Sequence, residues 1–181
     1  MQMGRNLTEF NRDNHVFGKS RVVLFLWFLI VRPFFTNIFI PIKLRPIILR
    51  FFGAKIGRNN KIKAKVQIHF PWKLQMGDNC WIGEGVTFIN HDYIKLGSNV
   101  CISQRSIICS SAHDYRSKSL EYAHKPIDIK DGAWICLDAK VLPGVTIGEC
   151  SVVSAGEIVM KSLPNYSILI AGKVRAIDPP K

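Results

Sequence analysis

Aliphatic side chains recur at every sixth position over much of this chain. The longest series in one register is Ile129, Ile135, Val141, Ile147, Val153 and Val159. A helix repeats about every 3.6 residues and a strand every two, so neither element alone presents such a series to a core. A short strand followed by a turn does, and three such units close one triangular coil of about eighteen residues. The pattern therefore predicts an all-β solenoid whose stacked coils bury an aliphatic column.

The same spacing predicts about five coils. Their first inward positions are Ile56, Met76, Leu96, Ile129 and Ile147. Slips of two residues between the early coils indicate insertions at one corner, and the long gap after Ile108 indicates a loop over residues 110–126. We divide the chain into an N-terminal segment (1–55), a repeat domain (56–177) and a tail (178–181).

Residues 21–50 combine an apolar run with spaced cations. The run from Val22 to Val31 ends at Arg32 and Pro33, which makes it shorter than the roughly 20 apolar residues that span a bilayer. It also lacks the small-residue cleavage site of a signal peptide. Two interpretations stay open: a helical cap on the repeat domain or on a partner subunit, or a basic, apolar element that lies on a membrane surface.

The net charge and the cysteine content limit which binding partners and which cellular compartment are expected. The net charge of +12 favours an anionic partner, yet no basic block interleaved with aromatic residues marks a nucleic-acid-binding surface. The five cysteines are odd in number and form no CxxC pair, which fits neither a zinc site nor a disulfide framework. A reducing compartment such as the cytoplasm is expected.

Three stretches carry a resemblance to a known family: HFPWKLQMGDNCWIGEGV (69–86), CISQRSIICSSAHDY (101–115) and the segment from KPIDIK to AGKV (125–174). From about residue 56 to 177 the chain resembles the hexapeptide-repeat acyltransferases, which fold as a left-handed parallel β-helix. The resemblance is strongest to the acetyltransferases of colanic acid biosynthesis and extends to maltose, galactoside and antibiotic O-acetyltransferases. It implies a homotrimer whose active sites are shared between subunits.

His113 begins the predicted loop, and long loops on rigid scaffolds often carry function. In the resembling enzymes the matching histidine is the general base that deprotonates the acceptor hydroxyl as it attacks acetyl-CoA. A histidine that only bonds its own loop is the alternative. Asp114 or a backbone carbonyl could orient the imidazole, and Asp114 is also a candidate acceptor ligand. His124 matches no family histidine and is expected to be structural. Asn90, at a corner of the preceding coil, is a candidate acceptor ligand or simply a turn residue.

The resemblance also places six residues along the donor: Trp134, Leu137 and Ala155 beside the pantetheine arm, and Lys161, Lys173 and Arg175 at the phosphate end of CoA. Leu137 and Ala155 are expected to act mainly through the backbone. The chain departs from the family where it reads AGKVRAI in place of the usual AGNPAKVI, and at Cys136–Leu137, where relatives carry smaller residues.

These features predict an O-acetyltransferase that moves acetyl from acetyl-CoA to a hydroxyl of a sugar or polysaccharide precursor, by direct transfer and without a metal. Surface polysaccharide biosynthesis is the expected setting. The enzyme is expected to be cytoplasmic and, under the interpretation in which residues 21–50 bind a membrane, peripheral at the inner face of the cell membrane. An acyl-cysteine mechanism is disfavoured because no histidine adjoins Cys101, Cys109 or Cys136 in the sequence. A non-catalytic β-helix scaffold and a γ-class carbonic anhydrase are the alternatives.

Overall fold

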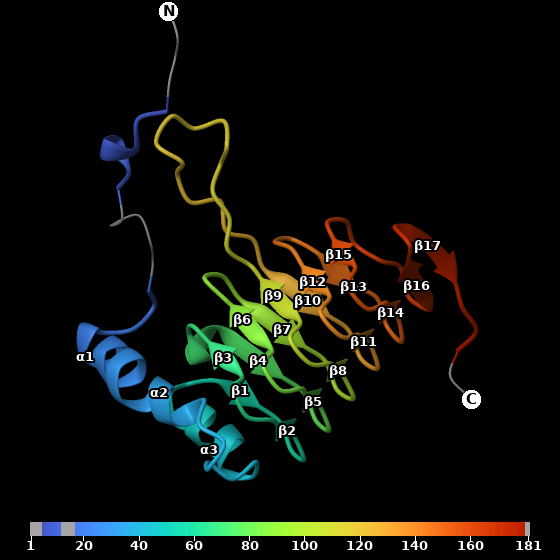
Figure 1. Ribbon diagram of the computed structural model, residues 1–181, viewed down its shortest axis with the longest axis horizontal. Helices are drawn as coiled ribbons and strands as arrows, with labels where there is room; N and C mark the ends of the chain where they lie inside the picture. The colour runs from blue at the N-terminus through green and yellow to red at the C-terminus, as the bar shows by residue number, and fades with distance from the viewer. Residues whose placement is uncertain (1–4, 12–16, 180–181) are drawn as a thin grey trace, which may run out of the picture.

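Short parallel strands stack into the three sides of a β-helix in the computed structural model, which describes residues 5–11 and 17–179 (Figure 1). The first sheet holds β1 (Lys55–Ile56), β4 (Leu74–Met76), β7 (Ile94–Leu96), β10 (Ile127–Ile129) and β13 (Thr146–Ile147). The second holds β2 (Lys61–Ile62), β5 (Trp81–Ile82), β8 (Cys101–Ile102), β11 (Trp134–Ile135), β14 (Val152–Val153), β16 (Ser167–Ile170) and the antiparallel β17 (Lys173–Ala176). The third holds β3 (Gln67–Ile68), β6 (Thr87–Ile89), β9 (Ile107–Cys109), β12 (Lys140–Val141) and β15 (Ile158–Val159).

The six-residue series forms the core of this stack, as predicted. In the first sheet the five predicted coil starts pair in succession, from Ile56 with Met76 to Ile129 with Ile147. All of these side chains are buried, and burying each aliphatic side chain contributes about 1.5–3 kcal/mol. The structure adds a sixth, incomplete turn in which Leu169 pairs with Val153. The six-residue spacing did not predict this turn, because the turn is two residues shorter than a regular coil. Its first inward residue, Leu163, pairs with Ile147 and follows Val159 after four residues instead of six.

The corners explain the glycines that follow the aliphatic positions. A Cβ on Gly57 would lie 2.6 Å from the carbonyl oxygen of Gly77 in the next coil, so only glycine lets the coils stack this closely. At the same corner Asn59, Asn79 and Asn99 adopt positive φ angles of 56–59°, which asparagine tolerates. Their side chains bond from coil to coil at 3.3 Å. The corner thus carries a ladder of asparagine amides.

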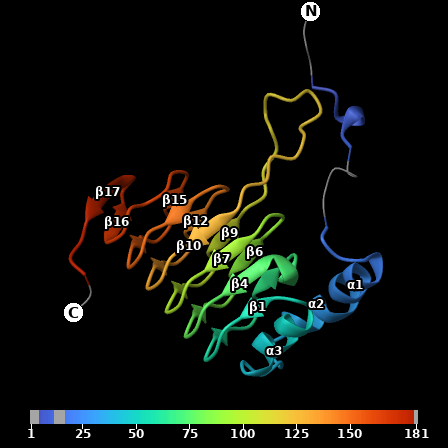
Figure 2. The same cartoon turned by 180° about the vertical axis from the view of Figure 1, so that it is seen from behind.

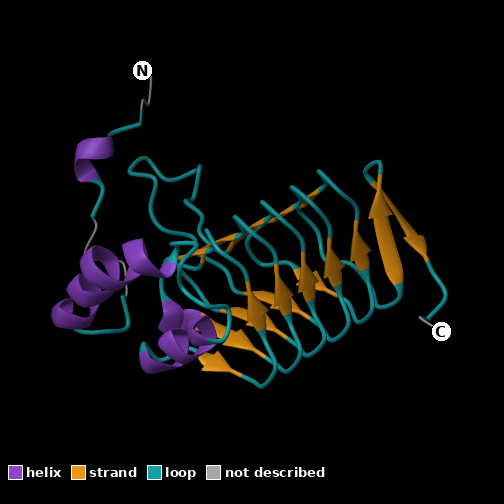
Figure 3. Ribbon diagram, turned by 60° about the horizontal axis from the view of Figure 1, so that its bottom comes forward, coloured by secondary structure: helices purple, strands orange, loops and turns teal. Residues whose placement is uncertain are grey.

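The N-terminal helices cover the open end of the first coil (Figure 3). They are α1 (Arg21–Phe25), the π-helix η3 (Leu26–Val31), α2 (Arg32–Phe35) and α3 (Leu44–Phe51), with the 3-10 turns η1 (Leu7–Glu9) and η4 (Pro71–Lys73) elsewhere. Trp27, Phe35 and Leu49 are buried in one core with the coils, and the indole of Trp27 donates to the Ile68 carbonyl at 3.2 Å. The inner face of these helices therefore caps the first coil of the β-helix. In the part of the chain that the structure describes, no helix is long and apolar enough to cross a membrane.

Residues 110–126 leave the stack between β9 and β10 as a single protruding loop (Figure 2). Its two limbs run antiparallel and are joined by backbone bonds from Asp114 to Glu121, from Ala123 to Ala112 and from Lys125 to Ser110. These bonds give the loop a defined base on which a functional side chain can be held.

Candidate active site

His113 stands on the first limb of this loop, opposite Tyr122 in an isolated β-bridge. Its Nδ1 lies 2.5 Å from the carbonyl oxygen of Leu120. A carbonyl only accepts hydrogen bonds, so Nδ1 carries the proton and donates it. In the neutral ring Nε2 then keeps its lone pair, which is the state that a general base requires.

Asp114 does not hold this imidazole. Its carboxylate accepts from the Arg116 backbone N–H at 2.9 Å and from Arg116 Nε at 3.2 Å. These bonds lower the pKa of Asp114, the backbone bond most strongly. Of the two orienting groups that the sequence allowed, the structure places the backbone carbonyl at Nδ1. The expectation that Asp114 contacts the acceptor stays a prediction.

Phe10 and Tyr122 flank the His113 ring, with centroids 5.7 and 5.1 Å from it. The N-terminal segment reaches the loop through a bond from the Asn6 amide to the Lys118 carbonyl, 3.0 Å long. Sequence reasoning did not identify Phe10, because it lies outside the repeats and only the folded chain brings it to the loop. In the folded chain, Phe10 limits how far the imidazole of His113 can rotate.

Behind the loop, further aromatic rings extend into the coils. His124 Nδ1 accepts a bond from the Ala112 amide at 3.1 Å, and its ring packs on Tyr122 and His91. Burial is the largest cause that lowers the pKa of His124, followed by the charges of Lys73 and His113. His124 therefore fixes the residue that precedes His113.

His69 and His91 form a close pair deeper in this row, with His69 Nδ1 at 3.2 Å from His91 Nε2. Burial, with a smaller contribution from Arg32, lowers the pKa of His69 to about 4, so its ring is neutral near pH 7. Within residues 5–11 and 17–179, no three His, Cys, Asp or Glu side chains gather as a metal-binding group.

Asn90 is completely buried beside this pair. Its Oδ1 accepts from the Phe70 amide at 3.0 Å and its Nδ2 donates to the Phe70 carbonyl at 2.6 Å. The side chain thus joins two consecutive coils at their common corner. The expectation that Asn90 contacts the acceptor stays a prediction, and in the conformation described here its amide serves the backbone.

The residues expected along pantetheine gather at another corner, between the second and third sheets. Trp134 is 48% exposed on β11, and its indole donates to Ser103 Oγ at 3.0 Å. Leu137 and Ala155 occupy equivalent turns of successive coils, linked by a 2.9 Å bond from the Gly156 amide to the Leu137 carbonyl. Among the described residues, nothing accepts a hydrogen bond from the backbone amides of Leu137 and Ala155. Both amides can therefore serve a ligand.

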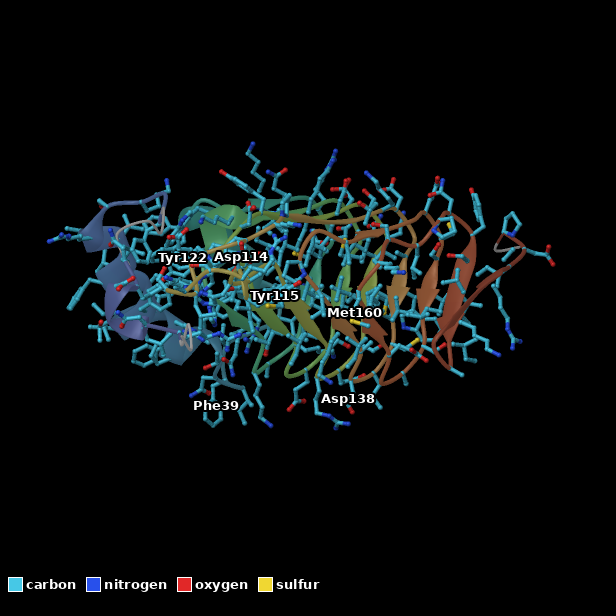
Figure 4. All side chains as sticks on the ribbon, turned by 90° about the horizontal axis from the view of Figure 1, so that it is seen from above. Phe39, Asp114, Tyr115, Tyr122, Asp138 and Met160 are labelled. Atoms are coloured by element: carbon cyan, nitrogen blue, oxygen red, sulfur yellow. The ribbon has the colours of Figure 1, made fainter. Side chains whose placement is uncertain are left out.

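A single chain does not bring His113 to this corner. The loop leaves from the carboxyl end of β9, at the corner between the third and first sheets, whereas the Leu137 turn lies at the corner between the second and third sheets. Figure 4 shows Asp138, next to Leu137, at one edge of the coils, with Asp114 and Tyr115 away from it. Lys161 follows β15, and Lys173 and Arg175 lie exposed on β17. The candidate residues of one chain thus form separate groups.

No family model matches the chain, but individual relatives do. The chain is 43% identical over 120 residues to the provisionally named colanic acid biosynthesis acetyltransferase WcaF of Escherichia coli K12. That alignment spans 66% of this chain and 66% of the relative. A galactoside O-acetyltransferase of the same organism is 28% identical over 123 residues, which are 66% of this chain and 61% of that protein.

Among solved structures, a hexapeptide-repeat acetyltransferase of Vibrio cholerae, complexed with acetyl coenzyme A, superposes with a TM-score of 0.72. The superposition covers 80% of each chain at 24% identity, which establishes a common fold. Together, the coil register, the sequence identity to WcaF and this shared fold show that the chain belongs to the hexapeptide-repeat acetyltransferases.

Proposed function

We propose that this protein transfers an acetyl group from acetyl-CoA to a hydroxyl of a sugar or polysaccharide precursor. The observation that carries the proposal is the bond from His113 Nδ1 to the Leu120 carbonyl, which leaves Nε2 as a proton acceptor on an exposed loop. The names of its relatives, which include colanic acid biosynthesis and galactoside acetyltransferases, support a carbohydrate acceptor.

In this reaction Nε2 of His113 takes the proton of the acceptor hydroxyl while the oxygen attacks the thioester carbonyl. The tetrahedral intermediate collapses, the C–S bond breaks, and the CoA sulfur leaves with the proton that the imidazolium returns. The Leu120 carbonyl holds the ring throughout and stabilises the imidazolium. Direct transfer needs no acyl-enzyme.

The cysteines support direct transfer. Burial is the largest cause that raises the pKa values of Cys101, Cys109 and Cys136, so their thiolates are disfavoured near neutral pH. A thiol that stays protonated is a poor nucleophile toward a thioester.

The donor would lie along the corner of Trp134, with the free amides of Leu137 and Ala155 bonding the pantetheine carbonyls. Lys161, Lys173 and Arg175 would meet the phosphates as exposed cations. Because Leu137 carries a large side chain at this turn, it would narrow the pantetheine groove.

A homotrimer would complete the site by placing the loop of one subunit against the donor corner of the next. The separation of the two groups within one chain supports this arrangement. Exposed apolar side chains on the coil sides also suit a subunit interface, for example Trp81 at 55% and Met160 at 72% exposure. A cyclic closed assembly is the usual outcome for such homo-oligomers.

An acceptor held at the inner face of the cell membrane would fit a cytoplasmic enzyme that uses acetyl-CoA. The deciding experiment offers acetyl-CoA with a panel of nucleotide sugars, lipid-linked sugars and oligosaccharides, and detects the acetylated product by mass spectrometry. A product heavier by one acetyl group, together with free CoA, is the expected result. CoA binding without any acetylated product across the panel would favour the scaffold alternative.

A further inference from the structure

The outer face of the N-terminal helices is apolar and exposed, although their inner face is buried. Apolar side chains more than half exposed in this segment include Leu29, Phe34, Ile47 and Phe51 in the helices and Ile38 and Phe39 in the turn between α2 and α3. Phe39 and Phe51 are the extremes, at 84% and 85% exposure. A concentration of apolar side chains on this scale marks a contact surface.

A groove runs through this face between η3–α2 and α3. Its volume is about 570 Å³. Its lining is wholly apolar and includes Leu26, Ile30 and Phe34 on one side and Ile47 and Phe51 on the other. No polar side chain lines it to recognise a specific partner, which suits the non-directional contact that acyl chains provide.

The charge of the protein is concentrated at the same end. Residues 17–77 contain 12 Lys and Arg and no Asp or Glu, so the whole net charge of +12 arises there. Arg45 is buried and holds the carbonyls of Phe35, Asn37 and Ile40. Other cations are exposed in the same segment, such as Arg21 at the start of α1 and Lys43 just before α3. An apolar surface bordered by cations complements an anionic lipid surface.

We propose that this helical end face docks on an anionic lipid bilayer, with the apolar side chains at the headgroup boundary and the cations against lipid phosphates. The charge asymmetry favours a bilayer over a protein partner. The docking goes beyond acetyl transfer and does not depend on it, so it can be tested without CoA or acceptor.

The test is cosedimentation of the full chain with vesicles of phosphatidylcholine, alone or with about 30% phosphatidylglycerol. Binding to the anionic vesicles should exceed binding to the neutral ones by at least about tenfold and fall in about 0.5 M salt. The double variants Phe39→Gln/Phe51→Gln and Arg21→Glu/Lys43→Glu should each lose about tenfold in partitioning. All four side chains are exposed, so folding should be retained, as circular dichroism would verify.

Matched controls come from elsewhere on the coils: Tyr93→Gln removes a large side chain that is 52% exposed, and Lys95→Glu reverses an exposed cation. Both should bind vesicles like the parent chain. Equal binding to neutral and anionic vesicles, or no binding to either, would overturn the proposal. So would self-association in lipid-free solution that Phe39→Gln/Phe51→Gln abolishes while vesicle binding is absent, because the face would then be a protein interface.

Discussion

His113→Ala should separate catalysis from folding. The imidazole lies on an exposed loop, so its removal leaves no cavity in the aliphatic column. The lost ring contacts with Phe10 and Tyr122 should cost about 1 kcal/mol of folding stability. Removing a positioned general base should instead cost about 10²–10⁴-fold in rate, or about 3–5 kcal/mol of transition-state stabilisation.

The assay follows the CoA thiol released with an acceptor verified by mass spectrometry. The loss should fall on kcat, with the KM for acetyl-CoA little changed, because the base acts only as the hydroxyl attacks. Lys118→Ala, which truncates an exposed side chain of the same loop, is the matched control and should keep the parental rate.

Turnover of His113→Ala within a few fold of the parent rate, on the verified acceptor, would place the base elsewhere. The Leu120 carbonyl would then hold a histidine that only shapes the loop.

Four further changes test other parts of the structure. Ile135→Lys should lower the melting temperature strongly, because an unpaired charge at this fully buried position costs several kcal/mol; an unchanged melting curve would contradict the aliphatic column. His69 has a folded pKa of about 4, below the unfolded value of about 6.5, so the unfolded chain binds more protons between these limits. The contribution of His69 to folding stability is therefore complete above pH 6.5 and is lost as the pH falls toward 4. Thermal melts over this range should show the free energy of unfolding fall by roughly 1–2 kcal/mol, a figure discounted for the partial exposure of the ring. The His69→Gln variant should not show this fall. His124→Ala should slow turnover about tenfold, since the Ala112 amide loses its acceptor beside His113, and parental turnover would reduce His124 to packing. Lys161→Ala should raise the KM for acetyl-CoA several-fold with kcat little changed, and an unchanged KM would remove Lys161 from the donor site.

The coil column could be predicted from the sequence because its cause is local. Each inward aliphatic is fixed by its place in a strand–turn unit, and one-dimensional spacing records that place directly. The sixth turn escaped this count because the pairing of Leu169 with Val153 depends on a shortened corner.

The candidate site was less accessible to sequence reasoning because its contacts join distant residues. The sequence indicated His113, but it could not decide between Asp114 and a carbonyl, since the position of Leu120 depends on how the loop folds back. It also carried no signal for Phe10, which reaches the loop from the far end of the chain.

The two ends of the coil stack have a consequence for solubility. Stacked parallel strands expose unpaired backbone groups at each end, and such edges are templates on which further strands can add without limit. Here the N-terminal helices cover the first coil, and β17 returns antiparallel along β16 with residues 173–176 paired to 167–170. The final β-ribbon therefore blocks the free edge of the second sheet. Cutting the chain before Lys173 should let β16 pair with a second copy at that end and yield dimers, while the helices still cover the other end and prevent growth into fibres.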